Sequence, residues 1–173
     1  MKKLDLFPGG AFLFESHYFE DERGVFLKVF NTDNSFLSDY TVKQINYVTS
    51  AEKHTLRGLH FQHGDNAESK VFRVINGAAQ VAFVDVRPDS PTYLQASTVV
   101  LDNPKRAVAI PRGFATGYLT LTNNTVMLYL ADNDYNVSTE GGLLWNDPAL
   151  NINWLEKNPI LSDKDKAWAL VTK

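Results

Sequence analysis

The segment KVFRVINGAAQVAFVDVRPD, residues 70–89, contains two strand-like runs separated by a tight-turn signal. Residues 70–75 and 79–86 are rich in valine, isoleucine and phenylalanine, and Asn76-Gly77 between them tolerates positive φ. In the second run both alternating faces are apolar, which is typical of a strand covered on two sides. The segment therefore predicts two strands separated by a turn, the second of them central in a sheet.

The same pattern continues outward in both directions. Turn signals recur at short intervals, as in Pro88-Asp89 and Asn123-Asn124. Strands are expected over residues 11–19, 25–31, 42–49, 56–62, 70–75, 79–86, 96–101, 107–110 and 125–130. Many short strands at this spacing predict an all-β jelly-roll barrel. A short C-terminal helix over residues 163–171, capped by Ser162, is expected in addition.

Composition narrows the class of protein. A chain of 173 residues fits one domain, residues 1–173, and the absence of cysteine excludes disulfides, thiolate catalysis and cysteine-ligated metals. The first ten residues have no apolar core of signal-peptide length, and no run approaches about 18 apolar residues, so we expect a cytoplasmic protein with no membrane partner. The formal net charge of −3 argues against a nucleic-acid partner.

Two stretches bear on whether such a barrel holds a metal ion. Many barrels of the double-stranded β-helix, or cupin, type bind a divalent metal through a His-x-His pair and a later histidine. Here His60 is paired with Gln62, and Thr116 occupies the later position. His63 is three residues from His60 and points to the other face of a strand. An amide and a hydroxyl are poor substitutes for imidazoles, so we expect no metal.

Short motifs in a consistent order run from Phe19 to Asp165. They are DERGVF (21–26), QIN (44–46), LRGLHFQ (56–62), SKV (69–71), DVR (85–87), SPT (90–92), IPRGFA (110–115), LWNDP (144–148) and LSDKD (161–165). This ordered set resembles the dTDP-4-dehydrorhamnose 3,5-epimerase family. The resemblance implies a cupin barrel that works without a cofactor.

The implied reaction inverts C3, or C3 and C5, of a nucleoside-diphosphate-linked 4-keto-6-deoxyhexose, in the synthesis of deoxysugars for surface polysaccharide such as O-antigen. The C4 ketone acidifies the protons on C3 and C5, so a base, an enolate stabiliser and an acid suffice. By analogy with the family, His60 is the base, Asp165 orients it, Lys70 stabilises the enolate and Tyr129 is the acid. Asp163 is the nearby alternative to Asp165.

Two local features agree with these roles. Lys70 shares strand parity with Phe72, which predicts that it points inward. Gly58 permits a bulge that would bring Arg57 and His60 onto one face of their strand.

The resemblance also implies a set of substrate-binding side chains and a homodimer. Arginine forks suit diphosphate oxygens, and amides suit hydroxyls. The substrate-binding positions are Arg57, Arg23, Gln44, Asn46, Phe19 and Lys28. In the homodimer an N-terminal strand crosses to the partner, and the apolar residues 11–14 suit either that contact or ordinary core.

Departures from the family pattern fall in or near the site. Thr116 replaces a histidine, Tyr129 is followed by Leu130 instead of lysine, and Asp134 replaces the first of two expected tyrosines. These changes favour inversion at C3 alone. Lys28 replaces an acidic residue where the family meets the nucleotide base, which leaves the nucleotide open between dTDP and CDP.

Three alternative functions remain at this stage. A ketoisomerase would use the same enolate chemistry to move the carbonyl. A metal-dependent cupin oxygenase or isomerase would need metal-binding side chains at the positions of Gln62 and Thr116. A non-catalytic nucleotide-sugar-binding cupin would account for the missing imidazole. The joint retention of His60, Lys70 and Tyr129 counts against this last alternative, because binding alone needs no acid and base.

Overall fold

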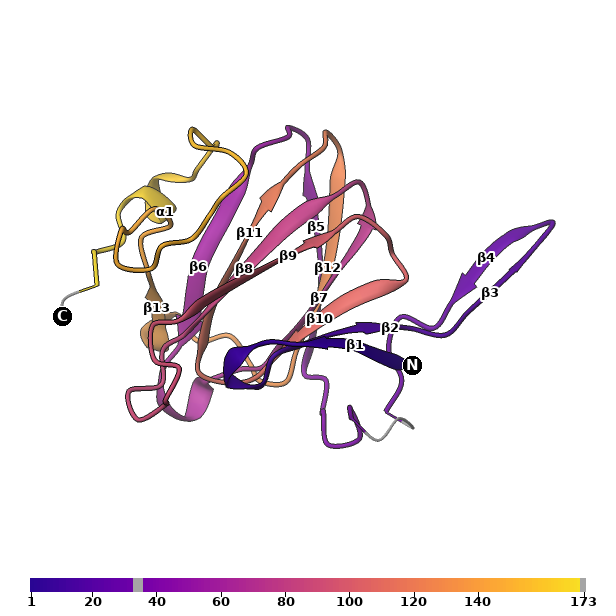
Figure 1. Ribbon diagram of the computed structural model, residues 1–173, viewed down its shortest axis with the longest axis horizontal. Coiled ribbons are helices and arrows are strands. Elements are labelled where there is room, and N and C mark those ends of the chain that lie inside the picture. The colour runs from indigo at the N-terminus through magenta and orange to yellow at the C-terminus, as the bar shows by residue number, and fades with distance from the viewer. Residues whose placement is uncertain (33–35, 172–173) are drawn as a thin grey trace.

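Two antiparallel sheets face each other and close the barrel (Figure 1). The computed structural model describes residues 1–32 and 36–171. One sheet has six strands in the order β1-β2-β10-β7-β12-β5, and the other has five in the order β13-β6-β11-β8-β9. A separate pair, β3-β4, forms a hairpin. The predicted all-β jelly-roll barrel is confirmed.

The elements have the following bounds. The strands of the six-stranded sheet are β1 (Lys2–Leu6), β2 (Phe12–Glu15), β10 (Arg106–Ile110), β7 (Lys70–Asn76), β12 (Thr125–Ala131) and β5 (Gln44–Ser50). The five-stranded sheet contains β13 (Glu140–Gly142), β6 (Leu56–Gln62), β11 (Phe114–Thr120), β8 (Ala79–Asp85) and β9 (Ala96–Leu101). The hairpin consists of β3 (Tyr18–Asp21) and β4 (Gly24–Leu27). The helix α1 (Asp163–Lys166) and the 3-10 turns η1 (Pro8–Gly10), η2 (Gly64–Asn66) and η3 (Val137–Thr139) complete the set.

Strand β8 is buried along its whole length, as its two apolar faces predict. Val81 and Phe83 pack into the core between the sheets, while Ala82 and Val84 pack under the C-terminal segment with Trp154. Apolar packing therefore covers both faces of β8.

The outer face of the six-stranded sheet is covered by the chain between the hairpin and β5. Leu37 packs there against Phe14 and Val71. Ala11 and Phe14 are fully buried, so residues 11–14 form ordinary core. Strand β1 and the β3-β4 hairpin are exposed instead, and we call the hairpin the arm (residues 18–27).

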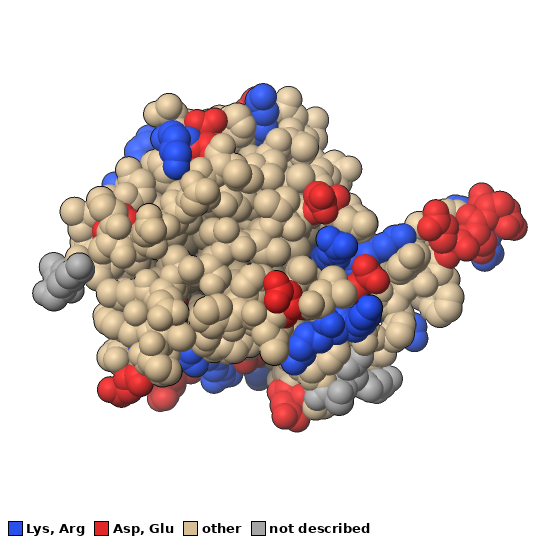
Figure 2. Space-filling view, viewed as in Figure 1, with Lys and Arg blue, Asp and Glu red and all other residues tan. Residues whose placement is uncertain are grey.

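The arm extends away from the barrel, with charged side chains at its tip (Figures 1 and 2). Its base is held by Arg73, which is only 1% exposed and donates to Ser16 Oγ at 2.7 Å and to the Val29 carbonyl at 2.9 Å. Burial lowers the pKa of Arg73 to about 10. Ser16 and Val29 flank the arm in the chain, so both of its ends are attached to the same buried guanidinium.

Several predicted strand boundaries were wrong. The run 11–19 is divided into β2, which ends at Glu15, and β3, which begins at Tyr18. The Ser16 amide continues the pairing of β2 with β10 by donating to the Lys105 carbonyl at 2.9 Å. The run 25–31 ends at Leu27, and the run 42–49 begins at Gln44.

Three strands, β1, β11 and β13, were not predicted. Strand β11 is fully buried, but Thr116, Gly117 and Thr120 interrupt its apolar pattern. Apolar periodicity therefore gave no strand signal over residues 114–120.

The C-terminal helix is also shorter than predicted. Ser162 caps it as expected, with its side chain accepting from the Asp165 amide, but α1 ends at Lys166 and not at Val171. Beyond it, Trp168 lies against Gly142, and the Val171 amide donates to Asp147 Oδ2 at 2.6 Å. These tertiary contacts replace the helical hydrogen bonds that residues 167–171 would have made.

No helix among the described residues is long and apolar enough to cross a membrane.

Candidate active site

The site consists of two adjoining hollows whose lining comes from both sheets of the barrel. The inner hollow, of about 280 Å³, is lined by Arg57, His60 and Asp165, among others. The outer hollow, of about 400 Å³, shares His60, Lys70 and Tyr129 with it. Because the shared residues join the two hollows, we treat them as one pocket.

A bulge in β6 brings Arg57 and His60 into this pocket together. Thr116 pairs with His60 and Tyr118 pairs with Arg57, so three steps along β6 oppose two along β11. Gly58 lies in the bulge at φ +116°, and a Cβ there would be 2.7 Å from the Gly117 Cα. A glycine is therefore needed at position 58, and the predicted bulge is present.

His60 is oriented by Asp165. Its Nε2 lies 2.6 Å from Asp165 Oδ1, and Ser162 Oγ donates to the other carboxylate oxygen at 2.9 Å. Burial works to raise the pKa of Asp165, but the hydrogen bonds from His60 and Ser162 outweigh it and hold the pKa below its usual value. Asp163, the alternative partner, is fully exposed and pairs with Lys166.

This pairing determines which nitrogen of His60 can act as a base. An ionised Asp165 accepts a hydrogen bond from Nε2–H, so Nδ1 of the neutral imidazole carries no hydrogen. Nδ1 is then able to accept a proton from a bound molecule.

Lys70 and Tyr129 belong to the opposite sheet. Lys70 opens β7, points into the pocket as predicted, and places its Nζ 2.9 Å from Glu68 Oε1. Tyr129 lies on the neighbouring strand β12. Burial and then the charge of Glu68 raise the pKa of Tyr129, while Arg57 lowers it by a smaller amount. The phenol of Tyr129 therefore carries its proton at neutral pH.

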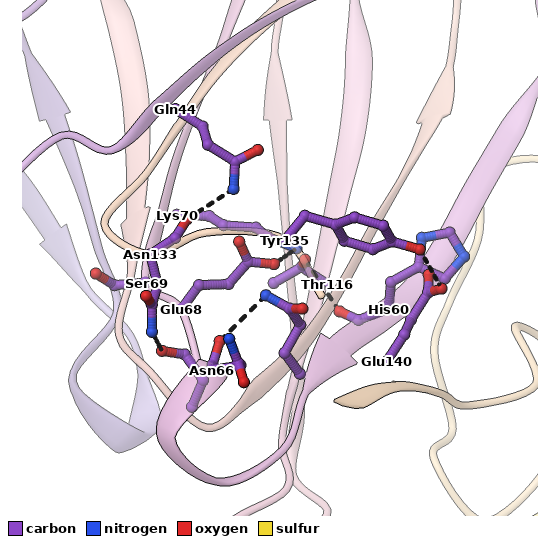
Figure 3. A network of polar contacts seen from close by, with 12 residues as sticks. Gln44, His60, Asn66, Glu68, Ser69, Lys70, Thr116, Asn133, Tyr135 and Glu140 are labelled. Carbon is purple, nitrogen blue, oxygen red and sulfur yellow. Dashed lines mark hydrogen bonds and ion pairs between the residues drawn. The ribbon is translucent and has the colours of Figure 1, made fainter. Parts of the chain in front are cut away.

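Gln44 and Asn46, two of the residues predicted to bind substrate, line the outer part of the pocket. They come from the edge strand β5, where Asn46 is the register partner of Tyr129. Gln44 Nε2 donates to the Asn133 carbonyl at 2.7 Å (Figure 3). The arrangement presents two amide side chains at the mouth of the pocket.

The remaining predicted binding residues are not at this pocket. Phe19 and Arg23 lie on the arm, where Phe19 is 64% exposed and Arg23 pairs with Asp21 at 2.5 Å. Lys28 follows the arm, and its amide bonds the His17 carbonyl at 3.1 Å. Within one chain, these three side chains are separate from His60.

Sequence reasoning missed a second charged cluster beside His60. Lys164 Nζ lies 2.6 Å from both oxygens of Glu140. The Tyr135 hydroxyl donates to Glu140 Oε2 at 2.7 Å (Figure 3). Burial opposes ionisation of Glu140, but Lys164 and Tyr135 together hold its pKa below the usual value. The LSDKD motif could have pointed to Lys164, because this lysine is adjacent to Asp165. No sequence pattern pointed to Glu140, which lies on the unpredicted strand β13.

Thr116 lies where many cupins supply a metal-binding histidine. Its Oγ1 donates to the His60 carbonyl at 3.4 Å, and its side chain lines the pocket. In the described part of the chain, no three His, Cys, Asp or Glu side chains are grouped as metal ligands would be.

Comparisons with known proteins agree with this geometry. The family model described as dTDP-4-dehydrorhamnose 3,5-epimerase matches residues 8–173. The enzyme of that name from Salmonella typhimurium is 39% identical over 165 residues, which cover 92% of this chain and 89% of the relative.

Solved structures are similar over most of their length as well. The dTDP-4-dehydrorhamnose 3,5-epimerase of Bacillus anthracis, with TDP and pyrophosphate bound, has a TM-score of 0.88 and 38% identity, covering 93% of this chain and 94% of its own. A 3'-monoepimerase from Streptomyces bikiniensis, in complex with dTDP-quinovose, has a TM-score of 0.87 and 29% identity, covering 98% and 87% respectively.

The barrel, the paired His60 and Asp165 facing Lys70 and Tyr129, and the match along residues 8–173 lead to one conclusion. This chain belongs to the dTDP-4-dehydrorhamnose 3,5-epimerase family.

Proposed function

We propose that this protein inverts C3 of a dTDP-linked 4-keto-6-deoxyhexose through an enolate, without a cofactor. The observation that carries the proposal is the placement of base and acid on opposite walls of one pocket. His60 comes from the five-stranded sheet, while Lys70 and Tyr129 come from the six-stranded sheet. Inversion requires proton removal from one face of the sugar ring and proton return to the other, and this geometry supplies both.

The steps balance without any further reactant. Nδ1 of His60 takes the C3 proton, the C–H electron pair forms the C3–C4 double bond, and the carbonyl π pair moves to the C4 oxygen. The ammonium of Lys70 stabilises that enolate oxygen. The Tyr129 hydroxyl then returns a proton to C3 from the opposite face, and the ketone forms again. Exchange with solvent removes the proton from His60 and restores the one on Tyr129.

The proposed substrate is supported by the pocket charges and by the relatives. None of the ion pairs formed among the described residues includes Arg57, so its guanidinium is available for a diphosphate. The similar structures carry TDP or a dTDP-sugar, which favours dTDP over CDP. Thr116 in place of an imidazole favours inversion at C3 alone.

We further propose that the protein acts as a homodimer, in which the arm of one copy reaches the pocket of the other. Phe19, Val25 and Phe26 of the arm are each more than half exposed, as are Ile45 and Tyr47 on the edge strand β5. These apolar surfaces suit burial in an interface. The partner's arm would then supply the side chains that one chain leaves distant from His60, namely Phe19, Arg23 and Lys28.

Proton exchange tests the proposed reaction directly. The protein is incubated in D₂O with dTDP- and CDP-linked 4-keto-6-deoxyglucose, and the C3 and C5 protons are followed by NMR. We expect exchange at C3 with the dTDP sugar and a loss of at least about 10²-fold in His60→Asn. The matched control is His63→Asn, because His63 is exposed on the other face of the chain and packs against Phe61.

Each other outcome selects a different function. Exchange at both carbons indicates a 3,5-epimerase, and a displaced carbonyl indicates a ketoisomerase. Binding of either nucleotide sugar without exchange contradicts the proposal and indicates a binding protein.

A further inference from the structure

Glu68 is a carboxylate inside the pocket that the reaction above does not use. It precedes Lys70 by two residues, which places both side chains on the same side of the chain. Their charged groups are 2.9 Å apart, and the side chains are only 9% and 12% exposed. Figure 3 shows Glu68 and Lys70 within the polar network that also contains His60. Both residues line the outer hollow with Tyr129.

We propose that Glu68 is a positioning residue for the epimerisation: its carboxylate holds the Lys70 ammonium at the enolate site, beside Tyr129. This inference rests on the proposed function, because the roles of Lys70 and Tyr129 come from there.

The first part of the argument concerns Lys70. A lysine carries its charge on a flexible four-carbon stem, so a fixed partner is needed to give the ammonium one position. The other carboxylates nearby are already engaged, Asp165 by His60 and Glu140 by Lys164. Removing Glu68 would leave the buried ammonium without its partner and allow it to move. Displacement of a catalytic group by about 1 Å is enough to slow a reaction.

The second part concerns Tyr129. The titratable and charged side chains around it come from every wall of the pocket: Glu68, Lys70, Arg57, His60, Tyr118, Tyr135, Glu140, Lys164 and Asp165. Of these, Glu68 raises the pKa of Tyr129 and Arg57 lowers it, in addition to the larger effect of burial. A neutral residue at position 68 would therefore lower the pKa of Tyr129. The titration of Tyr129 therefore reports whether the charge of Glu68 acts at the pocket beside Lys70.

Two substitutions separate the effects of charge and position. Glu68→Gln keeps the size and a hydrogen-bond acceptor but removes the charge, while Glu68→Asp keeps the charge and withdraws it by one methylene. Glu52→Gln is the control, because Glu52 is exposed. The protonation of Tyr129 is followed without substrate by NMR of ¹³Cζ-labelled tyrosine against pH, and Tyr129→Phe assigns the signal. The values of kcat and KM come from the exchange assay.

In the Glu68→Gln variant, we expect Tyr129 to lose its proton at a lower pH than in the wild type. We also expect kcat to fall by about 10- to 100-fold with little change in KM. Glu68→Asp should keep the wild-type titration but lose kcat. Glu52→Gln should match the wild type in both measurements. An unchanged Tyr129 titration or an unchanged kcat in Glu68→Gln overturns the inference, as does a lowered titration in Glu68→Asp. Absence of exchange in the wild type contradicts the proposed function instead, and the titration still reports on Glu68.

Discussion

His60 lies close to two carboxylates that differ in what they bind. Asp165 accepts from its Nε2 at 2.6 Å, whereas the oxygens of Glu140 are engaged by Lys164 and Tyr135. His60 still contributes to holding the pKa of Glu140 low, so the two groups share an electrostatic environment. The imidazole is thus oriented by one carboxylate and interacts electrostatically with the second. A base that must gain and lose a proton in each turnover benefits from this arrangement.

The Asp165→Asn variant tests this orientation. We expect kcat to fall by about 10²-fold or more, because the amide does not favour the imidazolium. We also expect a loss of about 2 kcal/mol in the free energy of unfolding at pH 7, the typical contribution of a hydrogen bond to a charged group.

The pH dependence of this loss follows from the sign of the pKa shift. The folded-state pKa of Asp165 is lowered, so its stabilisation is present above the unfolded pKa near 3.9 and is lost as the pH falls through the folded value. Urea unfolding measured from pH 7 to pH 3 should show that the difference in the free energy of unfolding between the wild type and Asp165→Asn becomes smaller as the pH falls. The exposed Asp163→Asn serves as control, and a gap that is equal across this range would contradict the assignment.

At the scale of elements, the bulge in β6 is what makes the pocket. It places Arg57 and His60 on one face although they are three residues apart, and it does so by bringing Gly58 against the backbone of β11. Any side chain at position 58 meets Thr116 O and Gly117 Cα at 2.7 Å. Both contacts are backbone atoms in a buried strand, so they cannot give way easily.

The Gly58→Ala variant should lose at least about 2 kcal/mol in the free energy of unfolding, from left-handed backbone strain together with the clash. Gly24→Ala is the matched control, because Gly24 has a similar φ of +121° and no atom lies within 4 Å of the position that a Cβ would take there. Urea denaturation of both variants measures the difference, which we expect to be larger for Gly58. Equal losses would mean that the close approach to β11 carries no cost.

At the scale of the whole molecule, base and acid belong to the barrel, while three predicted binding residues belong to the arm and its immediate flank. Arg73 fixes the base of the arm, so the arm does not need to fold back for the protein to be stable. In the proposed homodimer a second copy supplies the complementary arm, since a two-fold interface uses the same surfaces on both subunits.

Subunit mixing distinguishes a shared site from a self-contained one. We expect Arg23→Ala and His60→Asn each to have strongly reduced exchange activity as homodimers. Unfolding and refolding the two variants together should restore about one quarter of wild-type activity, because half of the dimers then contain one intact site. Analytical ultracentrifugation would check the dimer. If the mixture regains no activity, the arm does not contribute Arg23 to the partner's site.

The sequence by itself determined the fold class and many of the pocket residues. Apolar periodicity reports whether each residue is covered, which is why the central position of β8 could be predicted. Strand parity and a single glycine likewise predicted the inward Lys70 and the bulge at Gly58, because both are local properties of the chain.

Only the tertiary structure decided which charged groups meet. Asp165 is 105 residues from His60, and its choice over Asp163 depends on the direction in which the short helix α1 presents each side chain. The cluster of Glu140 and Lys164 depends on β13 pairing with β6, and the early end of α1 depends on contacts made by Trp168 and Val171. Local sequence patterns do not predict these contacts, because the contacts arise from register and packing between segments that are distant in the sequence.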